Sequence, residues 1–204
     1  MKVSLINLNL AARDAIGGCL INQARLFLRR GDEVRLYVCQ PPEGVPDELA
    51  AYTSVVTLAD LIGDREPHFR QSDLFIYHYP SRHPLMESIK GIERGAVIFY
   101  YHNVTPPELW GSEIDRDALV RGREGISLAH YADLVLTPSP FNVDDLVVRG
   151  GLDRSRVRVL PLGVPLDQFS PGPKDIDLVR RHNLEGRRVL MFVGRMAGNK
   201  RIDV

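Results

Sequence analysis

The sequence lacks an excess of charge of either sign and lacks a long apolar run. Lysine and arginine together number 26, and aspartate and glutamate also number 26, so the formal net charge is zero. General nucleic-acid binding needs an excess of positive charge, and this balance argues against it. No apolar run approaches the roughly 20 residues that a membrane-spanning helix requires. A general nucleic-acid-binding protein and a transmembrane protein are therefore not expected.

Cysteine is also scarce, since only Cys19 and Cys39 are present and their spacing matches no metal site. Reduced thiols and a cytoplasmic location are therefore the expectation. The opening segment, MKVSLINLNL, is too short and too polar for a secretory signal and predicts a first strand instead. The chain has 204 residues, 44% hydrophobic and 25% charged, which suits one large domain or one domain and part of another.

The most informative stretch is Ala96–Trp110, with the sequence AVIFYYHNVTPPELW. It opens with a run of apolar and aromatic residues that predicts a strand buried on both faces. His102 and Asn103 follow directly, and ligands of open α/β sheets bind at the carboxyl ends of parallel strands. Pro106 and Pro107 lack backbone donors, so the loop should leave the strand stiffly and not continue as a helix.

Strands and helices alternate along most of the chain. A strand at Lys2–Asn7, a helix at Cys19–Arg30 and a strand at Glu33–Val38 form a first unit, expected to be parallel and right-handed. Further strands are predicted at Val55–Val56, Leu74–Tyr77, Ala96–Tyr101, Leu134–Leu136 and Val157–Leu160. Further helices are predicted at Arg116–Ala132 and Asn142–Arg149. This order predicts an α/β protein with a doubly wound parallel sheet.

The composition changes at Ser170–Pro173, which predicts a linker. A short helix at Ile176–His182 and an eighth buried strand at Arg188–Val193 are expected to follow. A strand that leads into a basic glycine loop and then ends indicates the opening of a second domain that is cut short. The expected division is a domain at 1–169, a linker at 170–187 and the start of a second domain at 188–204.

Gly17 and Gly18 are expected just before the first helix. Free N–H groups and the helix dipole favour an anion such as a diphosphate at that position. The alternative is a tight turn in which only glycine fits. A nicotinamide site is unlike this pattern, because its glycines follow the first strand directly and an acidic residue ends the second strand. Here the second strand ends in Val38 and Cys39.

Four polar or aromatic side chains follow predicted strands. His102 could bond a hydroxyl, transfer a proton or hold a ligand, or it could only bond backbone atoms in its loop. His78 holds a similar position one strand earlier. Trp110 is either part of the core or a stacking platform for a ring. Ser139 either caps the next helix or helps its N–H groups hold a ligand, and no G-x-S-x-G motif marks it as a nucleophile.

Arg195 and Lys200 lie on the loop after the predicted eighth strand, with Gly194 and Gly198 allowing close backbone approach. Two cations in such a loop suit a phosphate or diphosphate. The alternative is a solvated basic loop.

In their order along the chain, these motifs resemble the retaining glycosyltransferases of family 4, which have the GT-B fold of two facing Rossmann-like domains. The corresponding segments are the glycine pair with the helix ending LFLRRGDEV, and then YYHN, LTPSPFNVDDLVVRGG, LPLGVPLDQFSP and VGRMAGNK. The resemblance implies transfer of a hexose from a nucleotide sugar to an acceptor hydroxyl, with retention at the anomeric carbon. The donor is then a substrate, and no cofactor or metal is implied.

The resemblance also implies roles for individual residues. Gly17 and Gly18 would lie near the donor diphosphate and sugar, and His102 would contact the donor sugar near the reacting carbon. Arg195 and Lys200 would neutralise the leaving nucleoside diphosphate in the place of a metal.

Three residues would border the acceptor side or the cleft between the domains: Asn103, Trp110 and Ser139. Because family members often work at a membrane face, peripheral membrane association is compatible with the resemblance. The acceptor and the oligomeric state are left open.

One departure limits what this chain is expected to do. The family's second domain carries a pair of glutamates that bind the donor, and the sequence ends at Val204 before any such pair. We therefore expect a fragment that folds but has little or no activity alone. Two alternatives stay open: a non-catalytic sugar- or nucleotide-binding module, and a sugar-nucleotide epimerase of the same fold. The epimerase would need carboxylates in the cleft, whereas these loops carry histidine, asparagine and serine.

Overall fold

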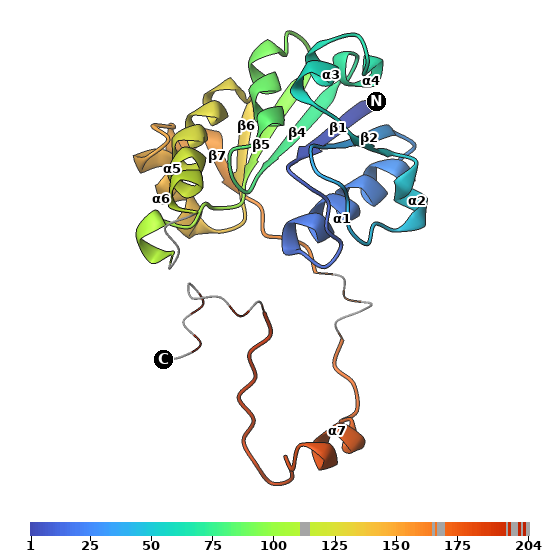
Figure 1. Ribbon diagram of the computed structural model, residues 1–204, viewed down its shortest axis with the longest axis vertical. Coiled ribbons are helices and arrows are strands. Elements are labelled where there is room, and N and C mark those ends of the chain that lie inside the picture. Colours follow the sequence, from blue (N-terminus) through green and yellow to red (C-terminus); the bar gives the residue numbers. More distant parts are fainter. Residues whose placement is uncertain are drawn as a thin grey trace.

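A parallel sheet forms the centre of the protein. The computed structural model describes residues 1–110, 115–164, 166, 170–194, 196, 200 and 202. Within them, the strands pair in the order β3-β2-β1-β4-β5-β6-β7, all parallel (Figure 1). Their bounds are Lys2–Asn7, Glu33–Val38, Thr53–Val55, Leu74–Tyr79, Ala96–Tyr101, Leu134–Thr137 and Val157–Val159 for β1 to β7. The predicted doubly wound α/β sheet is confirmed, and it is Rossmann-like.

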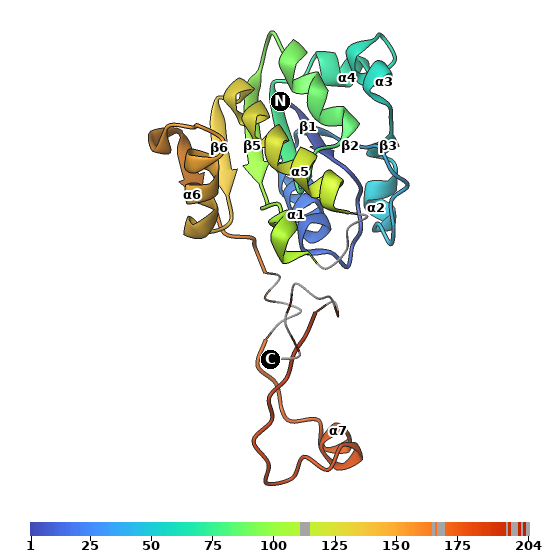
Figure 2. The same cartoon turned by 60° about the vertical axis from the view of Figure 1, so that its left-hand side comes forward.

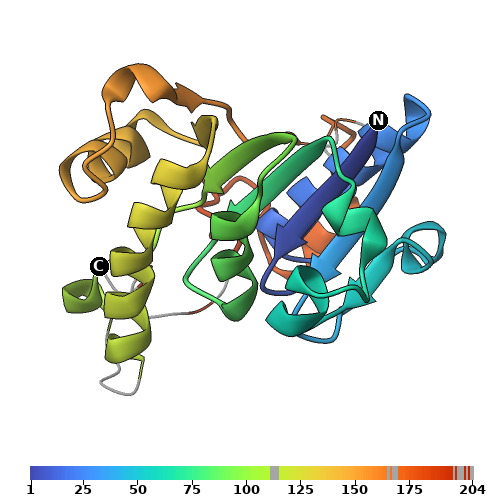
Figure 3. The same cartoon turned by 90° about the horizontal axis from the view of Figure 1, so that it is seen from above.

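Helices cover both faces of this sheet, with α1 on one side and α3 and α4 on the other (Figures 2 and 3). The α-helices α1 to α7 span Ala15–Arg29, Asp47–Ala50, Leu58–Ile62, Pro67–Arg70, Arg116–Glu124, Pro140–Val148 and Ile176–Arg181. The 3₁₀ helices η1 to η4 span Pro84–Gly91, Pro107–Leu109, Gly125–Tyr131 and Arg154–Arg156. Strand order reverses between β1 and β4, because β2 and β3 lie on one side of β1 and β4 to β7 on the other.

Two apolar clusters hold the helices on the sheet. On the first face, α1 and α2 pack against β1, β2 and β4 through Leu20, Ile21, Ala24, Phe27 and Leu49. On the second face, the elements that follow β3 contribute Leu61, Phe69, Leu85, Met86, Ile89, Ile126, Leu128, Ala129, Val143 and Leu146. Burial of apolar surface in both clusters is the main force that fixes the layers.

The first helix begins earlier than its apolar pattern indicates. It starts at Ala15 and not at Cys19, so Gly17 and Gly18 lie inside its first turns. The reason is Asp14, whose carboxylate accepts hydrogen bonds from the first-turn N–H groups and caps the helix. The expected location of the glycine pair before the helix was therefore wrong. Gly31 follows the helix with a φ of 81°, in the left-handed region that suits a glycine there.

The predicted helix at Arg116–Ala132 is divided into α5 and the tighter η3. The hydroxyl of Tyr79 donates a 2.6 Å hydrogen bond to the carbonyl of Gly122, which would otherwise serve the next helical turn. A Cβ at Gly125 would lie 2.2 Å from the same hydroxyl. The buried tyrosine therefore sets the point at which the helix changes.

The predicted eighth strand, Arg188–Val193, was wrong, because the structure describes these residues and assigns them to no strand. A strand is stabilised by hydrogen bonds to a neighbouring strand, and within the described residues none pairs with this segment. Its side chains are solvent-accessible, with Leu190 100% exposed. The short helix α7 before it, Ile176–Arg181, agrees with the prediction to within one residue.

Candidate functional site

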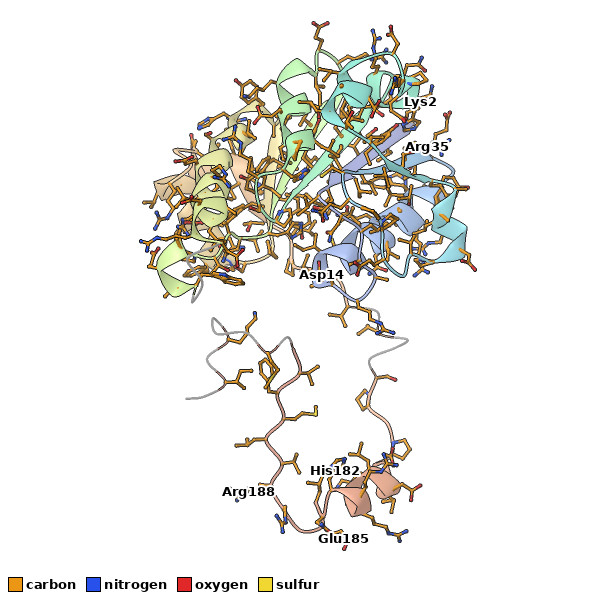
Figure 4. The ribbon with its side chains drawn as sticks, in the orientation of Figure 1. Lys2, Asp14, Arg35, His182, Glu185 and Arg188 are labelled. Atoms are coloured by element: carbon orange, nitrogen blue, oxygen red, sulfur yellow. The ribbon has the colours of Figure 1, made fainter. Side chains whose placement is uncertain are left out.

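The candidate site lies at the carboxyl edge of the sheet, where β1 and β4 are neighbours and the strand order reverses. Loops diverge at such a point, and ligands of open α/β sheets bind in the crevice that results. Lys2 at the amino end of β1 and Asp14 at the amino end of α1 lie at opposite edges of the sheet (Figure 4). The first turn of α1 therefore belongs to the same edge as the loops after β4 and β5.

The N–H groups of the glycine pair already have partners. The carboxylate of Asp14 accepts from the N–H of Ile16 at 3.2 Å and from that of Gly17 at 3.4 Å. The N–H of Gly18 donates to the carbonyl oxygen of Asp14 at 2.8 Å. A phosphate could reach the N–H groups of Ile16 and Gly17 only by displacing the carboxylate of Asp14, so this turn is not a preformed anion site.

The two glycines differ in what surrounds them. A Cβ on Gly17 would lie 1.9 Å from the carbonyl oxygen of Ala11, so the loop after β1 packs directly on the helix backbone there. Within the described residues, a Cβ on Gly18 would meet nothing within 4 Å. Close packing thus accounts for Gly17, while Gly18 leaves open space beside the first turn of α1.

His102 belongs to a chain of three polar side chains that connects the loop after β5 to α1. The Nε2 atom of His102 lies 2.8 Å from Nδ1 of His78, which is fully buried in β4. The Nε2 atom of His78 lies 2.9 Å from Oε1 of Gln23, on α1. The two imidazole planes differ by only 9°, and the N–N distance is shorter than the contact distance of stacked faces, so the rings meet edge to edge.

Both histidines are neutral at neutral pH. Burial lowers the pKa of His102 from 6.5 to about 4. Burial also lowers the pKa of His78 well below 6.5, and the neighbouring His102 lowers it further. A neutral imidazole carries one donor and one acceptor nitrogen, so each ring can continue a chain of hydrogen bonds.

Beside the point where the strand order reverses, Nδ1 of His102 and Oδ1 of Asn7 are buried and have no hydrogen-bond partner within the described part of the chain. Two further buried atoms after strands of this sheet share that property: Nε2 of His83, which follows β4, and Oγ1 of Thr137, which ends β6. Asn7 ends β1 and, because Ile6 is in register with Tyr77, lies beside His78 on the neighbouring strand. Buried polar atoms are nearly always paired in folded proteins, and an orphaned one indicates a water or a ligand that satisfies it. His102 and Asn7 are therefore the side chains best prepared to receive a donor group.

The loop after β5 is held by a buried ionic network. Asn103 has a φ of 77°, a left-handed conformation that asparagine tolerates better than most residues. The hydroxyl of Tyr101 donates to the carboxylate of Asp145 and accepts from the N–H of Val104. Arg123 binds Asp145 at 2.8 Å and the carbonyl of Val104 at 3.1 Å, with side chains of Arg123 and Asp145 only 10% and 12% exposed. The network fixes the turn that carries His102 and Asn103.

Aromatic packing steadies the imidazoles from the side. The ring of Tyr100 lies 4.5 Å from that of His102 and 5.4 Å from that of His78, between centroids. Its hydroxyl donates to the carbonyl of Leu160, just beyond β7. Tyr100 therefore connects the histidine pair to the start of the segment that leaves the sheet.

The remaining predicted site residues have different surroundings. Trp110 is half-buried and donates from Nε1 to Asp115 at 3.0 Å. Ser139 occupies the N-cap position of α6, but its side chain makes no capping hydrogen bond there. Lys200 is exposed, and Arg195 lies outside the described residues. The structure thus connects His102, through His78, to Gln23 of α1, the helix that also carries Gly17 and Gly18.

Sequence reasoning missed Gln23 and the pair formed by Arg123 and Asp145. A signal for Gln23 was present, because it is a polar residue beside the buried positions Leu20 and Ala24 of α1. The ion pair joins two different helices, and no spacing rule connects their residues. Only the packed structure could show it.

The described residues offer neither a metal site nor a membrane-spanning helix. They include no group of three or more histidine, cysteine, aspartate and glutamate side chains that could hold a metal ion. Nor does any of the described helices have the length and apolar character needed to cross a membrane. Cys19 and Cys39 are free thiols, and burial raises the pKa of Cys19 to about 11, so this thiol stays protonated.

Comparison with known proteins agrees with this geometry. A GDP-mannose-dependent alpha-mannosyltransferase of Mycobacterium tuberculosis is 33% identical over 76 residues, which cover 37% of this chain and 19% of that protein. A D-inositol 3-phosphate glycosyltransferase of Nocardiopsis dassonvillei is 32% identical over 94 residues, which cover 46% of this chain and 21% of that protein. The matches thus span about a fifth of each relative, 19% and 21%.

The family match is far longer than either pairwise match. The model of Glycosyltransferase Family 4 matches residues 18–168, which include α1 after its first residues, both histidines and β2 to β7. The matched region therefore contains most of the Rossmann-like sheet and of the site at its carboxyl edge. On this evidence, the chain belongs to glycosyltransferase family 4 and has the fold of a GT-B N-terminal domain.

Proposed function

We propose that this chain is the N-terminal part of an enzyme that transfers a hexose from a nucleotide sugar to an acceptor hydroxyl, with retention of anomeric configuration. Membership of glycosyltransferase family 4 supports the reaction class. The names of two relatives suggest GDP-mannose as a first donor to test and D-inositol 3-phosphate as a first acceptor. The proposed division keeps residues 1–169 as the acceptor-side domain, 170–187 as the linker and 188–204 as the start of the donor domain.

The orphaned Nδ1 atom of His102 carries the proposal. It is buried at the switch point of the sheet, and its ring is neutral at neutral pH because burial lowers its pKa to about 4. A neutral imidazole nitrogen can accept a hydrogen bond from a hydroxyl, and a hexose offers several hydroxyls. The low pKa also argues against proton donation by His102 at pH 7, so its role is to bind and orient the donor sugar.

The chemistry needs few groups from the protein. The bond between the anomeric carbon and the diphosphate oxygen breaks, a bond to the acceptor oxygen forms, and the acceptor proton passes to the released diphosphate. Charge develops on the diphosphate as it leaves, so cations placed beside it stabilise the transition state. We assign this task to Arg195 and Lys200 in the assembled enzyme, without a metal ion.

The remaining residues complete the proposed cleft. The open space beside Gly18 would admit the donor, since none of the described side chains fills it. Asn103, Trp110 and Ser139 would border the acceptor side. The hydroxyl of Ser139, which makes no capping hydrogen bond to α6, and the N–H groups of the first turn of α6 give this border hydrogen-bonding capacity.

The test is titration of the intact gene product with a panel of nucleotide sugars that includes GDP-mannose and UDP-glucose, followed by an NMR assay of the product anomer. Binding and transfer with the donor configuration retained would support the proposal. Binding without transfer would favour a non-catalytic module, and interconversion of nucleotide sugars would identify an epimerase. Failure to bind any nucleotide sugar would refute all three assignments.

A matched variant relates this result to the site. We expect His102→Phe to weaken nucleotide-sugar binding, because phenylalanine keeps the ring packing against Tyr100 but cannot accept a hydrogen bond. His68→Phe is the control, since His68 contacts the backbone of Glu33 near the amino edge of the sheet. Equal affinities of the wild type and His102→Phe would remove His102 from the donor site.

A further inference from the structure

The hydrogen-bond chain from Gln23 to His102 has a direction. Gln23 presents its carbonyl oxygen, Oε1, to Nε2 of His78 at 2.9 Å, and a carbonyl oxygen can only accept. The Nε2 atom of His78 must therefore carry the proton. In a neutral ring the other nitrogen, Nδ1, is then an acceptor.

The same reasoning extends to His102. The Nδ1 atom of His78 is an acceptor and lies 2.8 Å from Nε2 of His102, so Nε2 of His102 must be the donor. The remaining nitrogen, Nδ1 of His102, then carries a lone pair. It is this atom that is buried and lacks a partner within the described residues.

The other contacts of His78 and His102 do not bear on which ring nitrogen carries the proton. Tyr100 contacts both imidazoles only through its ring, because its hydroxyl donates a hydrogen bond to the carbonyl of Leu160. The backbone N–H of His102 donates to the carbonyl of Tyr79 at 3.0 Å, which fixes the position of the residue but not its ring proton. The polar contacts described for the two rings are the bond between them and the bond to Gln23.

We propose that Gln23 and His78 are positioning residues that hold His102 in the tautomer whose Nδ1 accepts a hydrogen bond from a hydroxyl of the donor sugar. This inference rests on the proposed function for the identity of the sugar, but not for the protonation pattern. The amide of Gln23 sets the proton position on His78, and His78 sets it on His102, so Gln23 acts without touching the ligand. Reversal of its orientation would turn Nδ1 of His102 into a donor and leave it mismatched to a hydroxyl proton.

The geometry explains why a glutamine lies on this face of α1. Gln23 is half-buried beside Leu20 and Ala24, both of which are fully buried in the apolar cluster under the helix. A polar side chain loses hydration at such a position and needs a partner to offset the loss. His78 is fully buried in β4 and supplies that partner, so each of the two groups satisfies the other.

The direct test is a long-range ¹H–¹⁵N NMR spectrum of the folded chain, which distinguishes protonated from lone-pair imidazole nitrogens. We expect Nε2 to be protonated and Nδ1 to be bare in both His78 and His102 at pH 7.5. In Gln23→Met, which keeps the volume and removes the acceptor, both rings should show mixed tautomers. A protonated Nδ1 on His102 in the wild type, or an unchanged spectrum in Gln23→Met, would overturn the proposal.

Ligand binding supplies the second readout, with the intact gene product and two probes, GDP-mannose and GDP. Gln23→Met should weaken GDP-mannose about 3- to 10-fold, the equivalent of one hydrogen bond, and leave GDP unchanged because GDP has no hexose. Gln71→Met is the matched control, since Gln71 accepts from Lys2 Nζ at the amino edge of the sheet. Equal loss of both probes in Gln23→Met would indicate a merely structural role and contradict the inference.

The two proposals fail separately. If wild-type protein shows the expected tautomers but binds neither GDP-mannose nor any other nucleotide sugar, the proposed function is wrong and the positioning chain stands. If nucleotide sugars bind while His102 carries its proton on Nδ1, the proposed function survives and the positioning role is wrong.

Discussion

Alanine substitutions at Gly17 and Gly18 should change the free energy of unfolding in opposite directions, although the two glycines are adjacent in α1. At Gly17 the new Cβ would lie 1.9 Å from the carbonyl oxygen of Ala11 and 2.7 Å from its carbon. At Gly18 it would meet no atom of the described part of the chain within 4 Å. Both glycines lie in the same helix, so alanine gains a similar helix propensity at each position. The difference between the two changes in unfolding free energy therefore reports the local contact.

The size of the destabilisation in Gly17→Ala depends on how firmly the backbone at Ala11 is held. The N–H of Ala12 donates to the carbonyl of Glu43 at 3.0 Å, and the N–H of Asp14 donates to the carbonyl of Ala11 at 3.0 Å. Moving the peptide between Ala11 and Ala12 therefore strains both of these hydrogen bonds. Overpacking of this kind costs about 1–3 kcal/mol, and here the contact is backbone rather than a flexible side chain. Even after the gain of up to about 1 kcal/mol from replacing glycine in a helix, Gly17→Ala should be clearly destabilising.

At Gly18 alanine brings only contributions that stabilise the folded state. Alanine reduces the entropy of the unfolded chain and is preferred in a helix by about 0.5–1 kcal/mol. Gly18→Ala should therefore stabilise the fold by up to that amount.

Urea unfolding followed by far-UV circular dichroism measures both effects, with the slope of the transition checking that the cooperativity is unchanged. A wild-type midpoint for Gly17→Ala would mean that the Ala11 carbonyl does not lie against the helix. A large destabilisation by Gly18→Ala would mean that the space beside it is filled. Either result would refute the distinction drawn between the two glycines.

Three further predictions concern ligand access, the ionic network and pH. Gly18→Ala should weaken nucleotide-sugar binding by the intact gene product while its stability is kept or raised, which titration with GDP-mannose would show; unchanged affinity would place the donor elsewhere. Arg123→Met should lower the free energy of unfolding by about 3 kcal/mol because it leaves Asp145 buried without its main partner. Arg149→Met is the control and should change the free energy of unfolding by less than about 1 kcal/mol, because Arg149 also binds Asp145 at 2.8 Å but is 51% exposed. Equal effects of the two substitutions in urea unfolding would contradict this account. Burial lowers the pKa of His102 from 6.5 to about 4, so the unfolded chain binds the proton more tightly, and the stability that this group contributes is complete above pH 6.5 and lost as the pH falls toward 4. The loss amounts to roughly 3 kcal/mol from this ring alone. Urea midpoints measured from pH 7 to 4.5 test it: a constant wild-type midpoint, or an equal pH dependence in His102→Phe, would contradict the prediction.

The alternation of strands and helices could be predicted from the sequence because each element carries its own periodic pattern. The bounds of β2 and β5 were predicted to the residue, since β-branched and aromatic runs are bordered there by glycine or polar residues. The start of α1 was not, because a helix end depends on its cap, and the Asp14 cap lies outside the apolar pattern on which the helix prediction rested. The segment Arg188–Val193 has the composition of a strand, but composition cannot supply the neighbouring strand that pairing requires.

The site was predictable only in part, for a related reason. His102 could be selected because it follows a buried strand, which is a local property of the sequence. Its partners come from α1 and β4, and no local pattern indicates that Gln23 and His78 meet. The orientation of His102 is thus a property of the packed fold, as is the support of its loop by Arg123 and Asp145.

The order of the strands has a consequence for how the protein folds. β1 is an interior strand between β2 and β4. Contacts on its β4 side join segments that are remote in the chain: the bond from the Lys2 N–H to Asp73 spans 71 residues. The Gln23–His78 contact spans 55 residues, whereas β1, α1 and β2 are contiguous and can form as one local unit. Because closing long loops costs entropy before any contact compensates for it, we expect the β1–α1–β2 unit to form early and the β4 side to dock later. On a ribosome, the binding edge would remain incomplete until β5 had emerged, so this family member would acquire its ligand site only after much of its domain had been synthesised.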